Sequence, residues 1–362
     1  MSRIILICFL FSFSLIVKSQ EFKLKKMDPE TIKSTLNRTI FNKKFLEYKI
    51  KAFDVGKNID SLARAEKKDL TLIIQNALNQ NKVVLLPNYV INVNDGGLLL
   101  NSDQILLFQP KTVLRLIPSS KMGYSILKLQ NVDNVKIFNA NIEGDKYSHL
   151  NDLGQWGFGI NIKSSNNITI YSPYIKKTWG DGIYIGQIKN RESTGIRIYN
   201  AVIDDVRRNG ISITSASGVV IKDSYIGNTN GNSPESALDI EPNSIDDIIE
   251  NIDISNLSTS NNKWAGILIV FEKFKSTIGK DVSIYIDGHK DIGSKNGIAF
   301  HGYRNDNFSD NLNGFIEVRK LNYKENSAKY FFYKTNFSSL EIKTNNCELK
   351  NQFNNSKKLW KP

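Results

Sequence analysis

Cysteine is scarce in this sequence, since only Cys8 and Cys347 occur among 362 residues. Two cysteines exclude a domain held together by a disulfide framework. No apolar run after the first twenty residues is long enough for a membrane span, which excludes a multi-span membrane protein. An apolar fraction of 40% and a charged fraction of 23% exclude a wholly disordered or collagen-like chain. The remaining class is a globular protein, and its length allows about two domains.

The N-terminus has the pattern of a secretory signal. Arg3 is followed by an apolar run without charge, Ile4–Val17, and then by Lys18, Ser19 and Gln20. A charged start, a short apolar run and a small-residue exit predict a signal peptide over 1–20. We therefore expect a secreted or periplasmic protein. Cys8 lies inside the run instead of after it, which argues against lipid attachment.

Negative charge is in the minority, with 36 acidic against 48 basic side chains and a formal charge of +12. Removing 1–20 takes away two positive charges and leaves an excess of about ten. A secreted basic protein attracts polyanions, and both acidic polysaccharide and nucleic acid are candidates. The alternative interpretation is a solvated, lysine-rich surface without a charged partner.

A loose repeat occupies most of the chain. It consists of tetrapeptides whose first residue is small, separated by steps of 23 to 31 residues that contain a second β-rich run. Such steps are typical of a β-solenoid, whose coils bury apolar side chains only by stacking. Alternation along each strand turns the two apolar side chains of a tetrapeptide inward. The predicted inner column consists of Ile160, Ile183, Ile211, Leu238, Ile267 and Ile298.

One helical pattern precedes the repeat, from Asp69 to Leu78. The spacing of Leu70, Ile73, Ile74 and Ala77 predicts an amphipathic helix. An open end of a solenoid exposes a sheet edge, so we expect this helix to cap it. The predicted organisation is a signal peptide (1–20), an N-terminal extension (21–52), the solenoid (53–345) and a basic, asparagine-rich tail (346–362). We expect a monomer.

Several stretches resemble the pectate-lyase-like right-handed parallel β-helix superfamily. The stretch 53–93 is similar to its N-terminal entry, and the stretches Trp179–Gly186, Arg207–Ile213 and Ser233–Asn243 are similar to its coils. The resemblance implies an all-β, right-handed parallel β-helix with an N-terminal capping helix. It also implies a carbohydrate-active protein, since the superfamily contains lyases, polygalacturonase-like hydrolases, uronan epimerases and phage tailspikes.

The chain departs from the motifs of the individual enzyme families. Polygalacturonase-like hydrolases carry a paired Asp, a Gly-His-Gly and an Arg-Ile-Lys. Here Gly180-Asp181-Gly182 contains a single Asp, Asn209 occupies the place of the histidine, and no Arg-Ile-Lys occurs. The Asp-Pro-His motif of the epimerases is absent as well. The resemblance therefore predicts the fold and a glycan-active face without selecting one activity.

Aligning the coils on their small residue brings polar side chains to one outer face. Neighbouring parallel strands are about 4.8 Å apart, so these side chains would lie within roughly 10 to 15 Å of one another. Asp239 and Glu241 both face outward from one strand, where carboxylates are disfavoured unless they have a function. Asp181 can also be read as a turn residue, and Arg208 as an ion-pair partner of a nearby Asp. The predicted catalytic residues are Asp181, Arg208, Asp239 and Glu241.

Other side chains near this face are candidates for substrate binding. Trp156 and Trp179 each stand three residues before the glycine of their coil, where they would form a platform for sugar rings or cover the base of a loop. His149 lies in a polar loop that could fold over the face. The predicted substrate-binding residues are Trp156, Trp179, Tyr184, Arg207, Asn209, His149 and Lys163.

Three functions remain open. The first is a lyase for an acidic polysaccharide, in which Asp239 and Glu241 bind Ca²⁺ and Arg208 or Lys163 removes the C5 proton. The second is a glycoside hydrolase that uses Asp181 with Asp239 or Glu241 as paired carboxyls. The third is a glycan-binding adhesin without catalysis. The sequence favours the lyase, with no nucleic-acid partner and no cofactor other than Ca²⁺.

Overall fold

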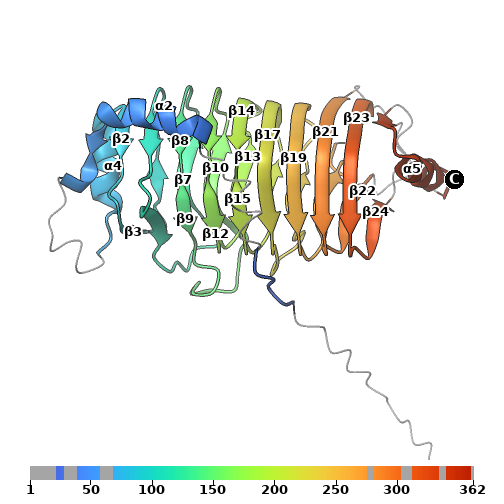
Figure 1. The fold of residues 1–362 in the computed structure, drawn as a ribbon, viewed down its shortest axis with the longest axis horizontal. Helices are drawn as coiled ribbons and strands as arrows, with labels where there is room; N and C mark the ends of the chain where they lie inside the picture. The colour runs from blue at the N-terminus through green and yellow to red at the C-terminus, as the bar shows by residue number, and fades with distance from the viewer. Residues whose placement is uncertain are drawn as a thin grey trace, which may run out of the picture.

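Coils of short strands stack along one axis, and every strand pairs in parallel with the strand of the next coil (Figure 1). The computed structural model describes residues 22–27, 39–57, 68–274, 280–302, 312–333 and 340–359. The predicted signal peptide, 1–20, lies outside the described residues. The architecture is the parallel β-helix that the repeat predicted. No helix in the described ranges has the length and apolar character needed to cross a bilayer.

A sheet of nine strands contains the predicted tetrapeptides. Its strands in chain order are β4 (Leu98–Leu99), β7 (Gly123–Gln130), β10 (Trp156–Lys163), β13 (Ile183–Gly186), β16 (Ile211–Ile213), β18 (Leu238–Ile240), β20 (Ala265–Val270), β22 (Asn296–His301) and β24 (Ala328–Tyr333). Because all nine strands are parallel and in register, equivalent positions of successive coils form straight columns.

The second sheet has sixteen strands and closes the other sides of the coils. One column contains β2 (Val83–Leu85), β5 (Ile105–Leu107), β8 (Lys136–Phe138), β11 (Thr169–Tyr171) and β14 (Ser193–Tyr199), with β1 (Phe53–Asp54) at its edge. A second column contains β3 (Val90–Val93), β6 (Val113–Leu116), β9 (Asn141–Glu143), β12 (Tyr174–Lys176) and β15 (Val202–Asp204). Both columns merge into long strands, β17 (Ala216–Gly227), β19 (Ile249–Ser260), β21 (Lys280–Ile292), β23 (Leu312–Lys324) and β25 (Leu340–Thr344).

The predicted inner column is confirmed residue by residue. Ile160 pairs with Ile183, Ile183 with Ile211, and the register continues unbroken to Ile298. All six members of the column are fully buried. Stacking of aliphatic side chains along the axis therefore builds the core, at about 25 cal/mol for each Å² of apolar surface removed from water.

Asparagines occupy many of the bends between strands. Asn167, Asn228 and Asn261 have φ values of 54°, 59° and 51°, a left-handed conformation that asparagine tolerates better than most residues. The side chain of Asn261 donates to that of Asn228 at 2.6 Å, and Asn167 donates to Asn134 at 2.7 Å. Side-chain ladders of this kind hold neighbouring bends together.

Helix α4 (Thr71–Gln80) covers the N-terminal end of the coils, as Figure 1 shows. Leu70, Ile74 and Ala77 are buried in the main core, as predicted. Ile73 is different, because 41% of its surface is exposed. One residue along a helix turns the side chain by about 100°, so Ile73 leaves the buried stripe formed by positions 70, 74 and 77. The prediction that Ile73 packs against the first coil was wrong.

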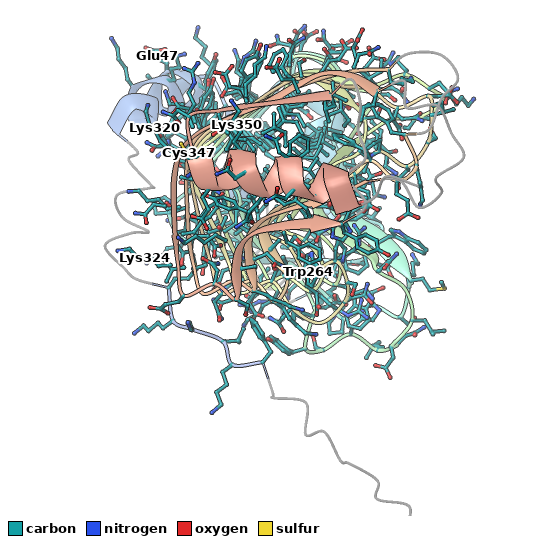
Figure 2. The ribbon with its side chains drawn as sticks, turned by 90° about the vertical axis from the view of Figure 1, so that its right-hand side faces the viewer. Glu47, Trp264, Lys320, Lys324, Cys347 and Lys350 are labelled. Atoms are coloured by element: carbon teal, nitrogen blue, oxygen red, sulfur yellow. The ribbon has the colours of Figure 1, made fainter. Side chains whose placement is uncertain are left out.

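Two segments outside the predicted solenoid are also ordered against it. In the tail 346–362, helix α5 (Cys347–Leu359) crosses the C-terminal end (Figure 2), and it buries Leu349 and Phe353 in the core. In the extension 21–52, helix α2 (Thr39–Ile50) packs Phe45 and Tyr48 around Phe138, with ring centroids 6.4 and 5.8 Å apart. Both ends of the β-helix are therefore covered by helices, and α2 shields an outer face.

Candidate active site

The outer face of the nine-stranded sheet carries the predicted polar column. Asn161, Tyr184, Ser212 and Asp239 lie directly beside one another on β10, β13, β16 and β18. The next strand places Leu268 beside Asp239, so the polar run ends there. This register is the one that the alignment of coils predicted.

A cleft with a volume of about 910 Å³ lies over this face. Its walls come from strands β10 to β22 and from the loops that precede them. The predicted site residues that line it are Trp156, Lys163, Tyr184, Arg208, Asp239 and Glu241. The structure therefore brings three of the four predicted catalytic residues to one cavity.

Asp181 lies beneath the cleft and is fully buried. Its two carboxylate oxygens accept from Nη1 of Arg208 at 2.9 and 3.2 Å, and one of them also accepts from the backbone N–H of Asn209 at 3.1 Å. Burial raises the pKa of Asp181, while the charge of Arg208 acts in the opposite direction. Asp181 does not line the cleft, whereas its partner Arg208 does.

Asp239 is 1% exposed, and its two carboxyl oxygens have different surroundings. Oδ2 accepts from Nδ2 of Asn209 at 2.8 Å, whereas Oδ1 is buried without a hydrogen-bond partner within the described ranges. Burial raises the pKa of Asp239 well above its usual value, and the negative charge of Glu241 raises it further, against the opposing effect of Arg208. A proton on Asp239 relieves the repulsion between the two carboxyls.

Asn209 fixes the geometry of this carboxyl. Its Nδ2 also donates to Oγ of Ser212 at 3.1 Å, and its Oδ1 accepts from the backbone N–H of Ser236 at 3.1 Å. The predicted substrate-binding residue Asn209 is therefore fully buried and acts on Asp239 instead of lining the cleft.

Asp239 and Glu241 alone would supply too few ligands for the predicted Ca²⁺ site. Calcium takes six to eight oxygen ligands, and the described part of the chain holds no group of three or more His, Cys, Asp or Glu side chains placed to hold a metal ion. Oδ2 of Asp239 already accepts from an amide, and the cation of Arg208 acts on the same carboxyl. A proton neutralises the pair with fewer ligands than calcium needs.

Three predicted binding residues form a separate stack away from the cleft. The ring of His149 stacks on Trp179 with centroids 4.0 Å apart, and its Nδ1 lies 2.7 Å from a carboxylate oxygen of Asp145. The guanidinium of Arg207 lies 3.7 Å from the centroid of the Trp179 ring. Trp179 is only 6% exposed, so its ring offers no platform to a sugar. Trp179, like Trp156, stands three residues before the glycine of its coil, but the loop that contains His149 covers the Trp179 ring.

Trp156 lines the cleft with 49% of its surface exposed, and its role as a platform for a sugar stays a prediction. Tyr184 lies on the floor, where its ring stacks on Phe158 and its hydroxyl is 2.9 Å from Oγ1 of Thr214. Lys163 extends over the Tyr184 ring, with Nζ 5.1 Å from the centroid. These three residues line the cleft on the N-terminal side of Asp239.

The wall on the C-terminal side contains none of the predicted site residues. It contains Trp264 and His301, whose rings meet edge to face with centroids 6.1 Å apart. Nε2 of His301 is buried without a partner in the part of the chain that the structure describes, and burial lowers the pKa of this histidine. A signal was present, because His301 pairs with Val270 in the outward position that Glu241 holds on its own coil.

No protein-family model matches the chain. Two curated proteins of Bacillus subtilis (strain 168) are similar to part of it. YclG, described as uncharacterised, is 29% identical over 48% of this chain and 32% of its own length. YorA, described as an uncharacterised SPbeta prophage-derived protein, is 27% identical over 40% of this chain and 28% of its own. The chain thus spans about a third of the length of the curated relatives that it matches.

A solved structure has a similar fold. It is the endo-xylogalacturonan hydrolase from Aspergillus tubingensis, with a TM-score of 0.52 and 14% identity, covering 74% of this chain and 73% of that one. At this identity the similarity establishes the parallel β-helix and no more. Fold and cleft together define a β-helix protein with a carboxyl-lined groove along its nine-stranded sheet.

Proposed function

We propose that this protein is a secreted enzyme that cleaves a polysaccharide by hydrolysis, with Asp239 as the proton donor. The observation that carries the proposal is a buried carboxyl, Asp239, in the wall of a cleft that is also lined by a second carboxyl, Glu241. Burial and the charge of Glu241 both raise the pKa of Asp239. Glycosidases use two carboxyl groups, one of which must hold a proton near neutral pH. Secretion rests on the signal peptide predicted over 1–20.

The residues around Asp239 have distinct roles in this mechanism. Asp239 donates its proton to the glycosidic oxygen as the bond from that oxygen to the anomeric carbon breaks. Glu241 either takes a proton from the water that attacks this carbon, or attacks the carbon itself to form a glycosyl-enzyme that water then hydrolyses. Arg208 supplies a fixed positive charge, held by Asp181. Asp181 itself is a positioning residue, because both of its oxygens are engaged beneath the cleft.

The fold neighbour supports this proposal only by analogy. The Aspergillus protein is described as an endo-xylogalacturonan hydrolase, and it shares the architecture with this chain. Function depends on the site more than on the fold. The carboxyl pair therefore carries the argument.

A lyase is the second candidate, favoured by Lys163. Burial lowers the pKa of this lysine, which increases the fraction of its amine that is unprotonated and able to accept a proton. In β-elimination the base takes the C5 proton, a C4–C5 double bond forms, and the bond from C4 to the leaving oxygen breaks. Arg208 is unsuited to the role of base, because a guanidinium does not lose its proton in proteins and this one is paired with Asp181.

One screen separates the candidates. The purified protein is incubated with neutral glycans, uronans and sulfated glycans, and both new reducing ends and the ultraviolet absorbance of unsaturated products are measured. New reducing ends without that absorbance indicate hydrolysis, and both signals together indicate elimination. Binding without either signal would favour an adhesin. Loss of activity in chelator would restore the case for Ca²⁺ at Asp239 and Glu241.

A further inference from the structure

Lys163 differs from the other cations around the cleft. Of the other two basic side chains that line it, Arg208 pairs with Asp181 at 2.9 Å, and Lys273 is exposed to solvent. Lys163 is half-buried, yet no carboxylate of the described residues pairs with it, and burial is the cause of its lowered pKa. The structure removes this ammonium group from water without supplying a counter-charge.

The position of Lys163 relative to the catalytic pair is defined by the sheet. Its Nζ lies over the ring of Tyr184 on β13, and Asp239 is on β18. Strand β16 lies between these two, so the separation is two strand steps, or about 10 Å. The ammonium group therefore lies along the cleft from the bond to be cleaved and not at it.

Charges near Asp239 do not favour an anion at the cleavage point. Glu241 and Asp239 are both acidic, and the nearby Arg208 is already paired with Asp181. The lining of the whole cleft contains three basic and four acidic side chains, so the excess positive charge of the chain is not concentrated there. Of the two half-buried basic side chains in this lining, Arg208 is paired and Lys163 has no carboxylate partner among the described residues, so an anionic substituent finds its cation at Lys163.

We propose that Lys163 is a specificity residue that binds a carboxylate or sulfate group on a sugar beyond the two that flank the cleaved bond. The inference rests on the proposed function, because it assumes that the cleft binds a glycan. A half-buried ammonium gains by pairing with an anion, because both its desolvation and its missing counter-charge are then compensated. The sugar that lies beside Lys163 would then carry an anionic group, independently of which sugars flank the cleaved bond.

The test measures binding separately from cleavage. An inactive background, Asp239→Asn, is titrated calorimetrically with polygalacturonate, with its methyl-esterified form, and with a sulfated galactan before and after desulfation. Lys163→Met keeps the apolar stem over Tyr184 and removes the charge. We expect it to weaken binding of the anionic polymers about tenfold and to leave binding of the neutralised polymers unchanged.

Lys128→Met is the matched control. Lys128 faces outward from the neighbouring strand β7 beside Asn161, but its Nζ donates to the carbonyl of Gly96 and it lies outside the cleft. This variant should bind every polymer as the parent does. Melting temperatures of both variants show whether either has lost its fold.

The outcomes separate the two proposals. Equal affinity of the parent and Lys163→Met for an anionic polymer, or no binding of any anionic polymer, overturns the role of Lys163. Lysine-dependent binding of an anionic polymer that wild-type protein does not cleave upholds that role and overturns the enzymatic proposal instead. Cleavage of a neutral glycan alone overturns the role of Lys163 and leaves the hydrolase in place.

Discussion

Asn209 donates a hydrogen bond of 2.8 Å from Nδ2 to Oδ2 of Asp239, while Oδ1 of Asp239 has no such partner within the described ranges. One oxygen is thus fixed by a buried amide, and the other remains for a proton. Asn209 stands where the resemblance places a histidine in polygalacturonase-like hydrolases. An amide at this place orients a carboxyl and carries no titratable proton of its own.

The N-terminal cap can be tested with two adjacent residues. Ile74 is fully buried in the core, and Ile73 is 41% exposed on the same helix. Ile74→Asp should lower the free energy of unfolding by several kcal/mol, or about 3 to 5, because it buries an unpaired charge. Ile73→Asp should change it by less than about 1 kcal/mol. Chemical denaturation of both variants measures the difference, and equal effects would show that α4 does not cap the core.

Replacing Trp264 and Trp179 by alanine should affect different properties, glycan binding for Trp264 and stability for Trp179. Trp264 lines the cleft, so Trp264→Ala should weaken glycan binding by up to about tenfold, the value of one aromatic contact. Trp179 is buried, so Trp179→Ala should cost about 3 to 5 kcal/mol of stability. Calorimetric titration and thermal melting of each variant check this. A stable Trp179→Ala protein that has lost only glycan binding would place that ring in the site after all.

A buried polar network in the C-terminal coils predicts a measurable pH dependence of stability. Oγ1 of Thr259 lies 2.8 Å from Nε2 of His289 and 2.5 Å from Oδ2 of Asp291. Burial lowers the pKa of His289 from 6.5 to about 3, and burial raises that of Asp291 from 3.8 to about 6. His289 binds its proton more readily in the unfolded chain, whereas Asp291 binds its proton more readily in the folded protein.

The two groups therefore give slopes of opposite sign. Stability contributed by neutral His289 is complete above pH 6.5 and is lost as the pH falls toward about 3. Stability contributed by protonated Asp291 is complete below pH 3.8 and is lost as the pH rises through about 6. Relative to wild type, His289→Gln should gain stability at about pH 4 compared with about pH 7, and Asp291→Asn should do the reverse, each by about 1 kcal/mol or more. Denaturation curves measured at both pH values give the stability of each variant relative to wild type. The prediction is contradicted if the change from pH 7 to pH 4 has the same sign for both variants.

The fold was predictable because its pattern is repeated along the chain. Each tetrapeptide gives the same period-2 signal, and the small residue at its start sets the register, so Ile160 and Ile298 were aligned across all the coils between them. The helix α5 was not predicted. Among the side chains that the structure describes in this asparagine- and lysine-rich helix, Leu349 and Phe353 are in the core, so few apolar residues mark its buried face.

The site was predictable only where side chains follow the strands. Tyr184 and Asp239 were placed correctly because strand alternation decides which way they face. Trp179 was not, because the loop that contains His149 folds over its ring, and the sequence repeat does not describe that loop. The role of Asp181 was also hidden, since its pairing with Arg208 beneath the cleft depends on the turns between strands.

The central claim is that Asp239 holds a proton in the folded protein and donates it to a glycosidic bond. It is tested most directly by the pH–rate profile of reducing-end release for wild type and for Asp239→Asn. The account predicts that wild-type activity extends above the usual pKa of an aspartate and falls as Asp239 ionises at higher pH. Asp239→Asn should lose at least about a hundredfold in kcat while its melting temperature at neutral pH is unchanged or higher, because a carboxyl that resists ionisation has been replaced by a neutral amide. Full activity of Asp239→Asn on a confirmed substrate would contradict the account.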